Sequence, residues 1–186
     1  MLMNQIVNTK EISWLSLQIL RTWPAGVPVP PLLSVADILE RDLDVVIQEW
    51  LMRVDKEPEL TAIPLSFEDR TGHLPQLLRD VIVRLRLDDE TKAEISKAAA
   101  HHGDLRAQQG YTVAMAVEES RLLQVSIFTT LHKSQSHLEF DVLLPDVVTI
   151  ADEVDAQLKQ QMLRFMASDA AKKVSAPKLA KVAKIA

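Results

Sequence analysis

Two neighbouring histidines, His101 and His102, and an arginine, Arg106, are the residues of this 186-residue chain whose types and spacing could do chemistry. His102 and Arg106 are four residues apart, so they share one face of a helix. Alanines and a leucine lie on or beside that face, and we therefore expect it to be at least partly buried. A buried charge needs a partner, so this helix predicts an acidic residue packed against it.

The nearest acidic residues along the sequence are Glu118 and Glu119, on the segment that follows a short connection at residues 110–111. A connection this short makes the two helices antiparallel neighbours. We therefore expect Arg106 to pair with Glu119, and we include Arg121, which ends the polar triplet Glu119-Ser120-Arg121, in the candidate site.

Two glycines and a third histidine complete the candidate cluster. Gly103 in mid-helix costs about 1 kcal/mol relative to alanine, and it permits close approach of another helix or of a ligand. Gly110 is expected to end the helix. His73 is expected to join the cluster from an earlier segment. The full candidate cluster is His73, His102, Gly103, Arg106, Gly110, Glu119 and Arg121.

This cluster has two interpretations that do not exclude each other. It is either a polar pocket that senses a ligand or a protonation state, or a buried polar network that fixes the register of the helices. A network of the second kind can also be the bistable element of a switch.

A metal site is the alternative function. His73, His101, His102 and Asp104 could supply ligands to a metal-binding bundle or a small metal-dependent hydrolase. However, adjacent histidines on a helix point about 100° apart, and no His-Glu-x-x-His pattern strengthens the case. We therefore assign no metal ligands, no catalytic residues and no cofactor. Haem is not favoured either, because aromatic residues make up only 4% of the chain.

Composition and charge exclude several function classes. The chain has no cysteine, which excludes disulfides and thiolate catalysis. Residues 170–186 hold five lysines and no acid, so the first 169 residues carry −10 of a total charge of −5. A body this acidic is a poor nucleic-acid binder. No apolar run of membrane-spanning length and no signal peptide appear, and we expect a cytoplasmic protein without nucleic-acid partners.

Helical periodicity predicts an all-α, antiparallel bundle of about five core helices. Residues 1–32 are expected to form an N-terminal helical appendage with a proline-rich linker at 23–32. Residues 33–170 form the helical, sensor-like domain, and residues 171–186 form a basic flexible tail. The stripe of the fifth helix, from Val147 to Phe165, is typical of core and is also long enough to pair with a second copy.

Capping signals divide this domain into helices. Ser34 opens a first helix that runs to Val54, and Ser66 opens a second, in which Gly72 and Pro75 predict a kink or two pieces. The remaining starts are Asp88 or Asp89 for the third helix, Thr112 for the fourth and Pro145, in the first turn, for the fifth.

Three segments, in this order, resemble the N-terminal domain of RsbT co-antagonist proteins of the RsbRD type: His73-Leu74-Pro75, His102-Gly103-x-x-Arg106-Ala107-x-x-Gly110-Tyr111 and Glu119-x-Arg121-Leu122-Leu123. The Trp50-Leu51 and Glu57-Pro58-Glu59-Leu60 segments are also similar, and the resemblance covers roughly residues 33–135. In that family the domain is a helical sensor module that precedes an output domain, such as a histidine kinase or a STAS domain, in stress signalling.

The resemblance implies a non-enzymatic signalling module. Only about fifteen residues follow the fifth helix, so we expect the chain to act through a partner kinase or STAS-type protein rather than through its own output domain. A homodimer is a further prediction. The basic tail is interpreted first as solvated and second as a weak contact with anionic membranes, with lysines on one side and apolar residues on the other.

Overall fold

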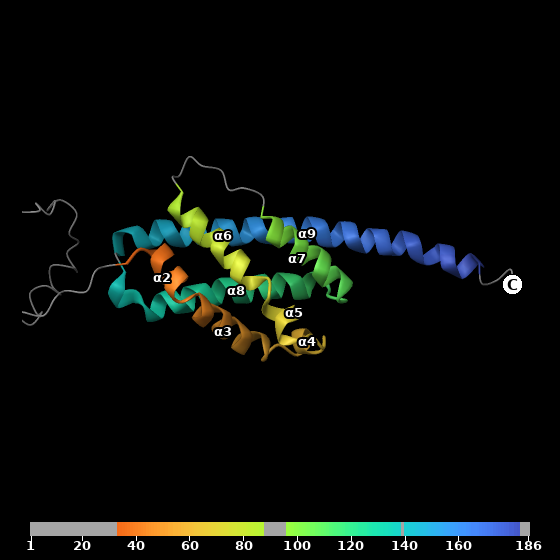
Figure 1. Cartoon of the computed structure of the whole chain (residues 1–186), viewed down its shortest axis with the longest axis horizontal. Helices are drawn as coiled ribbons and strands as arrows, with labels where there is room; N and C mark the ends of the chain where they lie inside the picture. The colour runs from red at the N-terminus through yellow and green to blue at the C-terminus, as the bar shows by residue number, and fades with distance from the viewer. Residues whose placement is uncertain (1–32, 88–95, 139, 183–186) are drawn as a thin grey trace, which may run out of the picture.

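A computed structural model describes residues 33–87, 96–138 and 140–182, and these residues are helical, as the sequence predicts. The predicted appendage at 1–32 lies outside this range. The elements in Figure 1 are α2 (Val35–Arg41), α3 (Leu43–Val54), α4 (Pro58–Thr61), α5 (Phe67–Thr71), α6 (Leu74–Arg86), α7 (Lys97–Gln108), α8 (Val113–Lys133), the 3-10 turn η1 (Gln135–His137) and α9 (Phe140–Val182).

Hydroxyl side chains cap the starts of four helices. The predicted caps Ser34, Ser66 and Thr112 are confirmed, since each side-chain oxygen accepts a hydrogen bond from the backbone amide three residues later. Ser96 caps α7 in the same way. Each bond satisfies an amide that the first helical turn leaves without a partner.

Two of the predicted helix starts differ from the structure. The third helix begins at Lys97, and the predicted caps Asp88 and Asp89 lie outside the described residues. The fifth helix begins at Phe140, so Pro145 is its sixth residue and not part of its first turn. Pro145 has no amide hydrogen, so α9 lacks one backbone hydrogen bond at this position.

Each of the first two predicted helices is divided in two. The single helix expected from Ser34 to Val54 is interrupted at Asp42, which separates α2 from α3. The segment from Ser66 breaks at Gly72 and His73, which separates α5 from α6, as the kink prediction allowed. The second break is important for the site, because it exposes the carbonyl end of α5 in the interior of the bundle.

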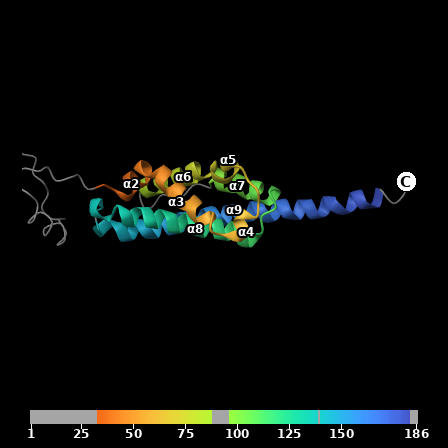
Figure 2. The same cartoon turned by 90° about the horizontal axis from the view of Figure 1, so that it is seen from below.

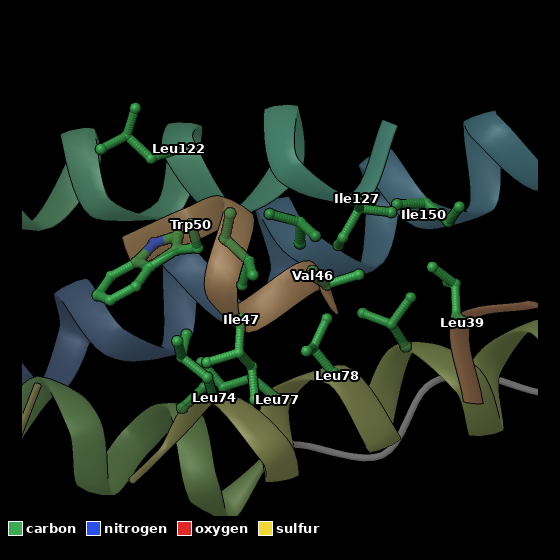
Figure 3. Close-up of a cluster of buried hydrophobic side chains, with 14 of the residues drawn as sticks. Leu39, Val46, Ile47, Trp50, Leu74, Leu77, Leu78, Leu122, Ile127 and Ile150 are labelled. Atoms are coloured by element: carbon green, nitrogen blue, oxygen red, sulfur yellow. The ribbon is translucent and has the colours of Figure 1, made fainter. Parts of the chain in front are cut away.

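The apolar core lies between α2, α3, α6, α8 and α9. Figure 3 shows Val46, Ile47 and Trp50 of α3 beside leucines of α6, with Ile127 of α8 and Ile150 of α9 on the opposite side. These side chains are almost completely buried. Burial of an aliphatic or aromatic side chain of this kind contributes roughly 1.5–3 kcal/mol each, so the packing of α3 anchors the bundle.

Small residues on α7 bring it unusually close to α9. Ala99, Gly103 and Ala107 are four residues apart and all buried, so they form one stripe along α7. A Cβ atom on Gly103 would lie only 2.2 Å from the backbone carbonyl oxygen of Gln161 on α9. The prediction that Gly103 permits close approach is therefore confirmed, and the approaching element is α9.

The long helix α9 packs along α6, α7 and α8 and then continues past them (Figures 1 and 2). Ile150, Val154 and Phe165 of its predicted stripe are buried in the chain's own core. Dimerisation through this stripe stays a prediction, as does the domain boundary near residue 170, through which α9 runs on to Val182. None of the described helices combines the length and apolarity needed to cross a membrane.

Candidate functional site

The centre of the polar cluster is the carboxylate of Glu119, on the buried side of α8. Its Oε2 accepts a hydrogen bond of 2.9 Å from Nε of Arg106 and lies 3.4 Å from Nε2 of His102. Its Oε1 accepts a 2.8 Å hydrogen bond from the hydroxyl of Tyr111. His102, Arg106 and Glu119 are 2%, 0% and 3% exposed. The predicted pair of Arg106 and Glu119 is confirmed.

Arg106 also caps the short helix α5. Its Nη1 donates to the carbonyl of Asp69 at 3.1 Å, and its Nη2 donates to the carbonyl of Arg70 at 3.1 Å. These carbonyls belong to the last turn of α5, where no following turn supplies amides. A positive charge at the C-terminal end of a helix also interacts favourably with the helix dipole. The break before α6 therefore creates the acceptors that bind Arg106.

A second arginine binds backbone carbonyls at a helix end in the same way, one element earlier in the chain. Arg70 lies on α5 and is buried, and its guanidinium donates to the carbonyl of Leu60 in α4 and to that of Ile63, just beyond α4. Arg106 holds α5, and Arg70 of α5 holds α4. The two arginines thus connect α7 to the first half of the bundle through backbone carbonyls.

Gly110 places Tyr111 beside the carboxylate. Gly110 has a φ of +85°, which glycine adopts without steric cost, and the amide of Tyr111 donates back to the carbonyl of Arg106 at 3.1 Å. This is the Schellman pattern that ends many helices. The turn brings the ring of Tyr111 over the guanidinium of Arg106, 4.7 Å from its carbon Cζ to the ring centroid.

His73 joins the cluster, as predicted, by stacking on His102. The ring centroids are 3.7 Å apart and the planes differ by 13°. His73 is the residue immediately before α6, so the break between α5 and α6 also sets the position of this ring. The indole of Trp50 meets His73 edge-on at 6.2 Å, and its Nε1 donates to the backbone carbonyl of Glu119.

Helix α9 adds a polar face that the sequence analysis missed. Glu153, Gln157 and Gln161 are four residues apart, and each is about 5% exposed. Gln157 donates at 3.0 Å both to the carbonyl of Leu77 and to the carboxylate of Glu153. The signal was present in the sequence: each of these three polar residues lies three positions after one of the apolar residues Ile150, Val154 and Leu158.

A small cavity of about 20 Å³ lies between the histidine pair and α9. Its lining includes His73, His102, Glu119, Gln157 and Gln161. Four buried polar atoms of these residues have no hydrogen-bond partner in the described structure: Nδ1 of His73, Nδ1 of His102, Oε1 of Gln157 and Nε2 of Gln161. A volume of this size holds about one water molecule and excludes an organic substrate.

Burial and neighbouring charges shift the ionisation of the cluster. Burial lowers the pKa of His73 well below its ordinary value, and His102 and Arg106 lower it further. Burial also lowers the pKa of His102, although Glu119 opposes this. Burial alone would raise the pKa of Glu119, but His102 and Arg106 outweigh it and the pKa is lowered. Near neutral pH the cluster therefore holds neutral imidazoles beside a carboxylate–guanidinium pair.

Burial of the tyrosine next to a carboxylate has the expected effect. The pKa of Tyr111 is raised, first by burial and then by the negative charge of Glu119. The phenol therefore stays protonated and acts as a donor to Glu119.

Two predicted residues lie outside the cluster. Arg121 is exposed on α8, where it pairs with Glu118, because two residues along a helix correspond to about 200° of rotation away from Glu119. His101 is exposed, whereas His102 is buried, so His73, His101 and His102 do not converge as the metal alternative requires. Within the described ranges, no group of three or more histidine, aspartate or glutamate side chains could hold a metal ion.

Most hydrogen-bonding groups of Arg106 are used within the cluster. Four of the five guanidinium hydrogens of Arg106 already have acceptors, the fourth being Oε1 of Gln109 at 2.7 Å. An anionic substrate would have to displace Glu119 or a backbone carbonyl to bind there. What remains unsatisfied is the pair of imidazoles and the two glutamines of α9.

Comparison of the chain with protein-family models, with curated proteins and with solved structures found no match.

Proposed function

We propose that this chain is a non-enzymatic signalling module, similar to the N-terminal domain of RsbRD-type stress regulators, that acts through a partner kinase or STAS-type protein. The observation that carries this proposal is the convergence of scattered motif residues. His73, His102, Arg106, Tyr111 and Glu119 belong to the three segments that carry the resemblance, and they form a single buried network.

The position of the network supports a role in transmission. It joins α5, α7 and α8 and lies against the polar face of α9, which continues beyond the other helices (Figure 1). A change at the cluster can therefore alter the packing of a helix whose far end is available to a partner. Buried polar networks of this kind have two discrete arrangements more readily than apolar packing does.

Affinity purification from the native cells tests this proposal. We would cross-link cells that express the tagged full-length chain and compare it with the variants Glu119→Gln and His132→Gln. His132 is exposed on α8 and serves as the matched control. We expect a kinase or STAS-domain protein to co-purify with the unchanged chain and with the control. With Glu119→Gln, the amount of that protein recovered should change at least fivefold, which is the lower end of ordinary allosteric coupling.

Two outcomes would contradict the proposal. The first is that no kinase or STAS-domain protein is enriched over an untagged strain. The second is equal retention of that protein by Glu119→Gln and the unchanged chain, at temperatures where circular dichroism shows both to be folded. Stoichiometric zinc or iron that disappears in His102→Ala would instead support the metal-binding alternative.

A further inference from the structure

The histidine pair has unused capacity to accept a proton. Nδ1 of His73 and Nδ1 of His102 are buried and lack hydrogen-bond partners among the described residues. The Nε2 of His102 faces the carboxylate of Glu119, which favours the tautomer with its hydrogen on Nε2. In that tautomer, Nδ1 of His102 carries a lone pair and is the basic atom.

The same cavity offers an acceptor for the new N–H group. Oε1 of Gln157 is buried and unpartnered, and Gln157 lines the cavity together with both histidines. A neutral Nδ1 and a carbonyl oxygen are both acceptors and cannot bond to each other. Once Nδ1 of His102 is protonated it becomes a donor, and Gln157 is the acceptor that it can bind.

The pair is built to take up one proton rather than two. Two imidazolium rings stacked at 3.7 Å would repel each other in surroundings of low polarity. Arg106 adds a further positive charge, while Glu119 favours a single charge on His102. The positive charge of the first proton is therefore compensated by Glu119, whereas that of a second proton is not.

The surroundings of the pair contain few other ionisable groups. From α3, the uncharged indole of Trp50 meets His73. The ionisable residues that act on the pair directly are His101 and Arg106 on α7 and Glu119 on α8. Arg70 on α5, Tyr111 before α8 and Glu153 on α9 contact the residues around the pair, and Asp80 on α6 acts on Glu153.

We propose that the His73–His102 pair is a proton-binding site, and that uptake of one proton from solvent shifts α9 relative to α7. The proton would be the signal of the module, so this inference rests on the proposed function for its biological meaning. The physical link is Gln157: its Oε1, which has no partner among the described residues, would accept the bond from His102 and draw this part of α9 toward α7. The present contacts of Gln157 on α6 and α9 are made by its other side-chain atom, Nε2. Gln161, one turn further on, lies at the tight contact with Gly103.

The first experiment uses Trp50 as the reporter of the histidine pair, because its indole meets His73, which stacks on His102. The chain has three tryptophans, so the variant Trp14→Phe/Trp23→Phe leaves Trp50 alone. A positive charge on the stacked pair is expected to quench the emission of this indole. We expect a reversible loss of Trp50 emission in one transition below about pH 6.5, the ordinary histidine range, while far-UV circular dichroism stays constant.

Variants decide whether the pair causes this transition. The transition is expected to disappear in His102→Gln and to persist in His132→Gln, which changes an exposed histidine. A flat emission profile, or an unchanged transition in His102→Gln, would overturn the proposal. If His102→Gln does not fold, the ring ¹⁵N shifts of the unchanged chain give the answer, because His102 must take up its proton before the protein unfolds.

The second experiment measures the movement of α9. Because the chain has no cysteine, Met52→Cys on α3 and Met166→Cys on α9 create two unique and exposed sites for spin labels. We expect the distance distribution to shift by about 1–2 Å or more across the fluorescence transition, which is typical of helix shifts. The shift should be absent in His102→Gln, and an unchanged distribution in the folded protein would refute the movement.

These measurements separate the two proposals, since they use the purified chain and need no partner. A proton transition without any kinase or STAS-type partner would leave the proton site and remove the signalling role. A partner that responds to Glu119→Gln, without a proton transition, would leave a module with a different signal.

Discussion

At the residue scale, Glu119 and Arg106 matter because neither can be removed alone without leaving the other charged and buried. The sequence predicted this pair from spacing: His102 and Arg106 four residues apart, and an acid on the next helix. It could not predict the carbonyls of Asp69 and Arg70 as partners, because backbone acceptors appear only where a helix ends. It also included Arg121, although helical geometry alone places a residue two positions after Glu119 about 200° around α8.

A double-mutant cycle measures the buried pair. Arg106→Met alone is expected to cost about 3–5 kcal/mol of unfolding free energy, since it leaves Glu119 uncompensated. Together with Glu119→Gln the cost should fall short of the sum by about 0.5–3 kcal/mol, measured by urea denaturation.

The exposed pair Arg121 and Glu118 provides the control for this cycle. The same substitutions there, Arg121→Met and Glu118→Gln, should give a coupling of about 0.2–1 kcal/mol, as is usual for surface ion pairs. A buried pair that couples no more strongly than the exposed one would contradict the interpretation that Arg106 and Glu119 hold α7 and α8 together.

At the element scale, the helix caps were the most predictable features. Ser34, Ser66 and Thr112 could be identified because capping is a local interaction, in which the hydroxyl accepts a hydrogen bond from the backbone amide three residues later. The break at Asp42 was not identified, since the apolar spacing from Val35 to Val54 is continuous. In the structure α2 packs mainly on α6 and α3 mainly on α8, a difference that local spacing does not show. The polar face of α9 was missed for a related reason: the adjacent apolar stripe was taken to define its buried side.

Two glycine substitutions distinguish close packing from backbone strain. Gly103→Ala must displace α9, so we expect a loss of about 1–3 kcal/mol or more in thermal or urea unfolding. Gly110→Ala meets no atom within 4 Å, but it must adopt a φ of +85°, which costs about 1–2 kcal/mol.

The spin-label distance between α3 and α9 separates these two effects. It should change in Gly103→Ala and stay the same in Gly110→Ala. Equal distances in both variants would show that α9 does not depend on the bare surface of α7.

At the scale of the whole molecule, the buried histidines predict a protein that loses stability in acid. Their pKa values are lower in the folded chain than in the unfolded one, so the unfolded chain takes up protons first as the pH falls. Their stabilising contribution is complete above about pH 6.5 and decreases below it. Because the pKa of Glu119 is lowered in the folded chain, stability decreases further once the pH falls below the ordinary pKa of a glutamate. The pKa of Glu153 is raised, so this residue has the opposite effect.

Urea denaturation between pH 8 and pH 5 checks this sign. We expect the unfolding free energy to fall by up to about 1.4 kcal/mol per pH unit for each histidine that stays neutral. The slope should decrease in His73→Gln, and it should also decrease at the pH where the folded pair takes up its own proton. A free energy that rises from pH 7 to pH 6 would contradict the burial of neutral imidazoles.

The contact between Gly103 and Gln161 restricts how α9 can move. Ala99 and Ala107 lie one turn on either side of Gly103, and each carries the methyl group that glycine lacks. A slide of α9 by one turn, about 5.4 Å, would press its backbone against one of these methyl groups. A piston-like stroke along the axis is therefore blocked, while a swing about Gly103 is not. The glycine acts as a fulcrum, and the length of α9 beyond the bundle is the arm of the lever.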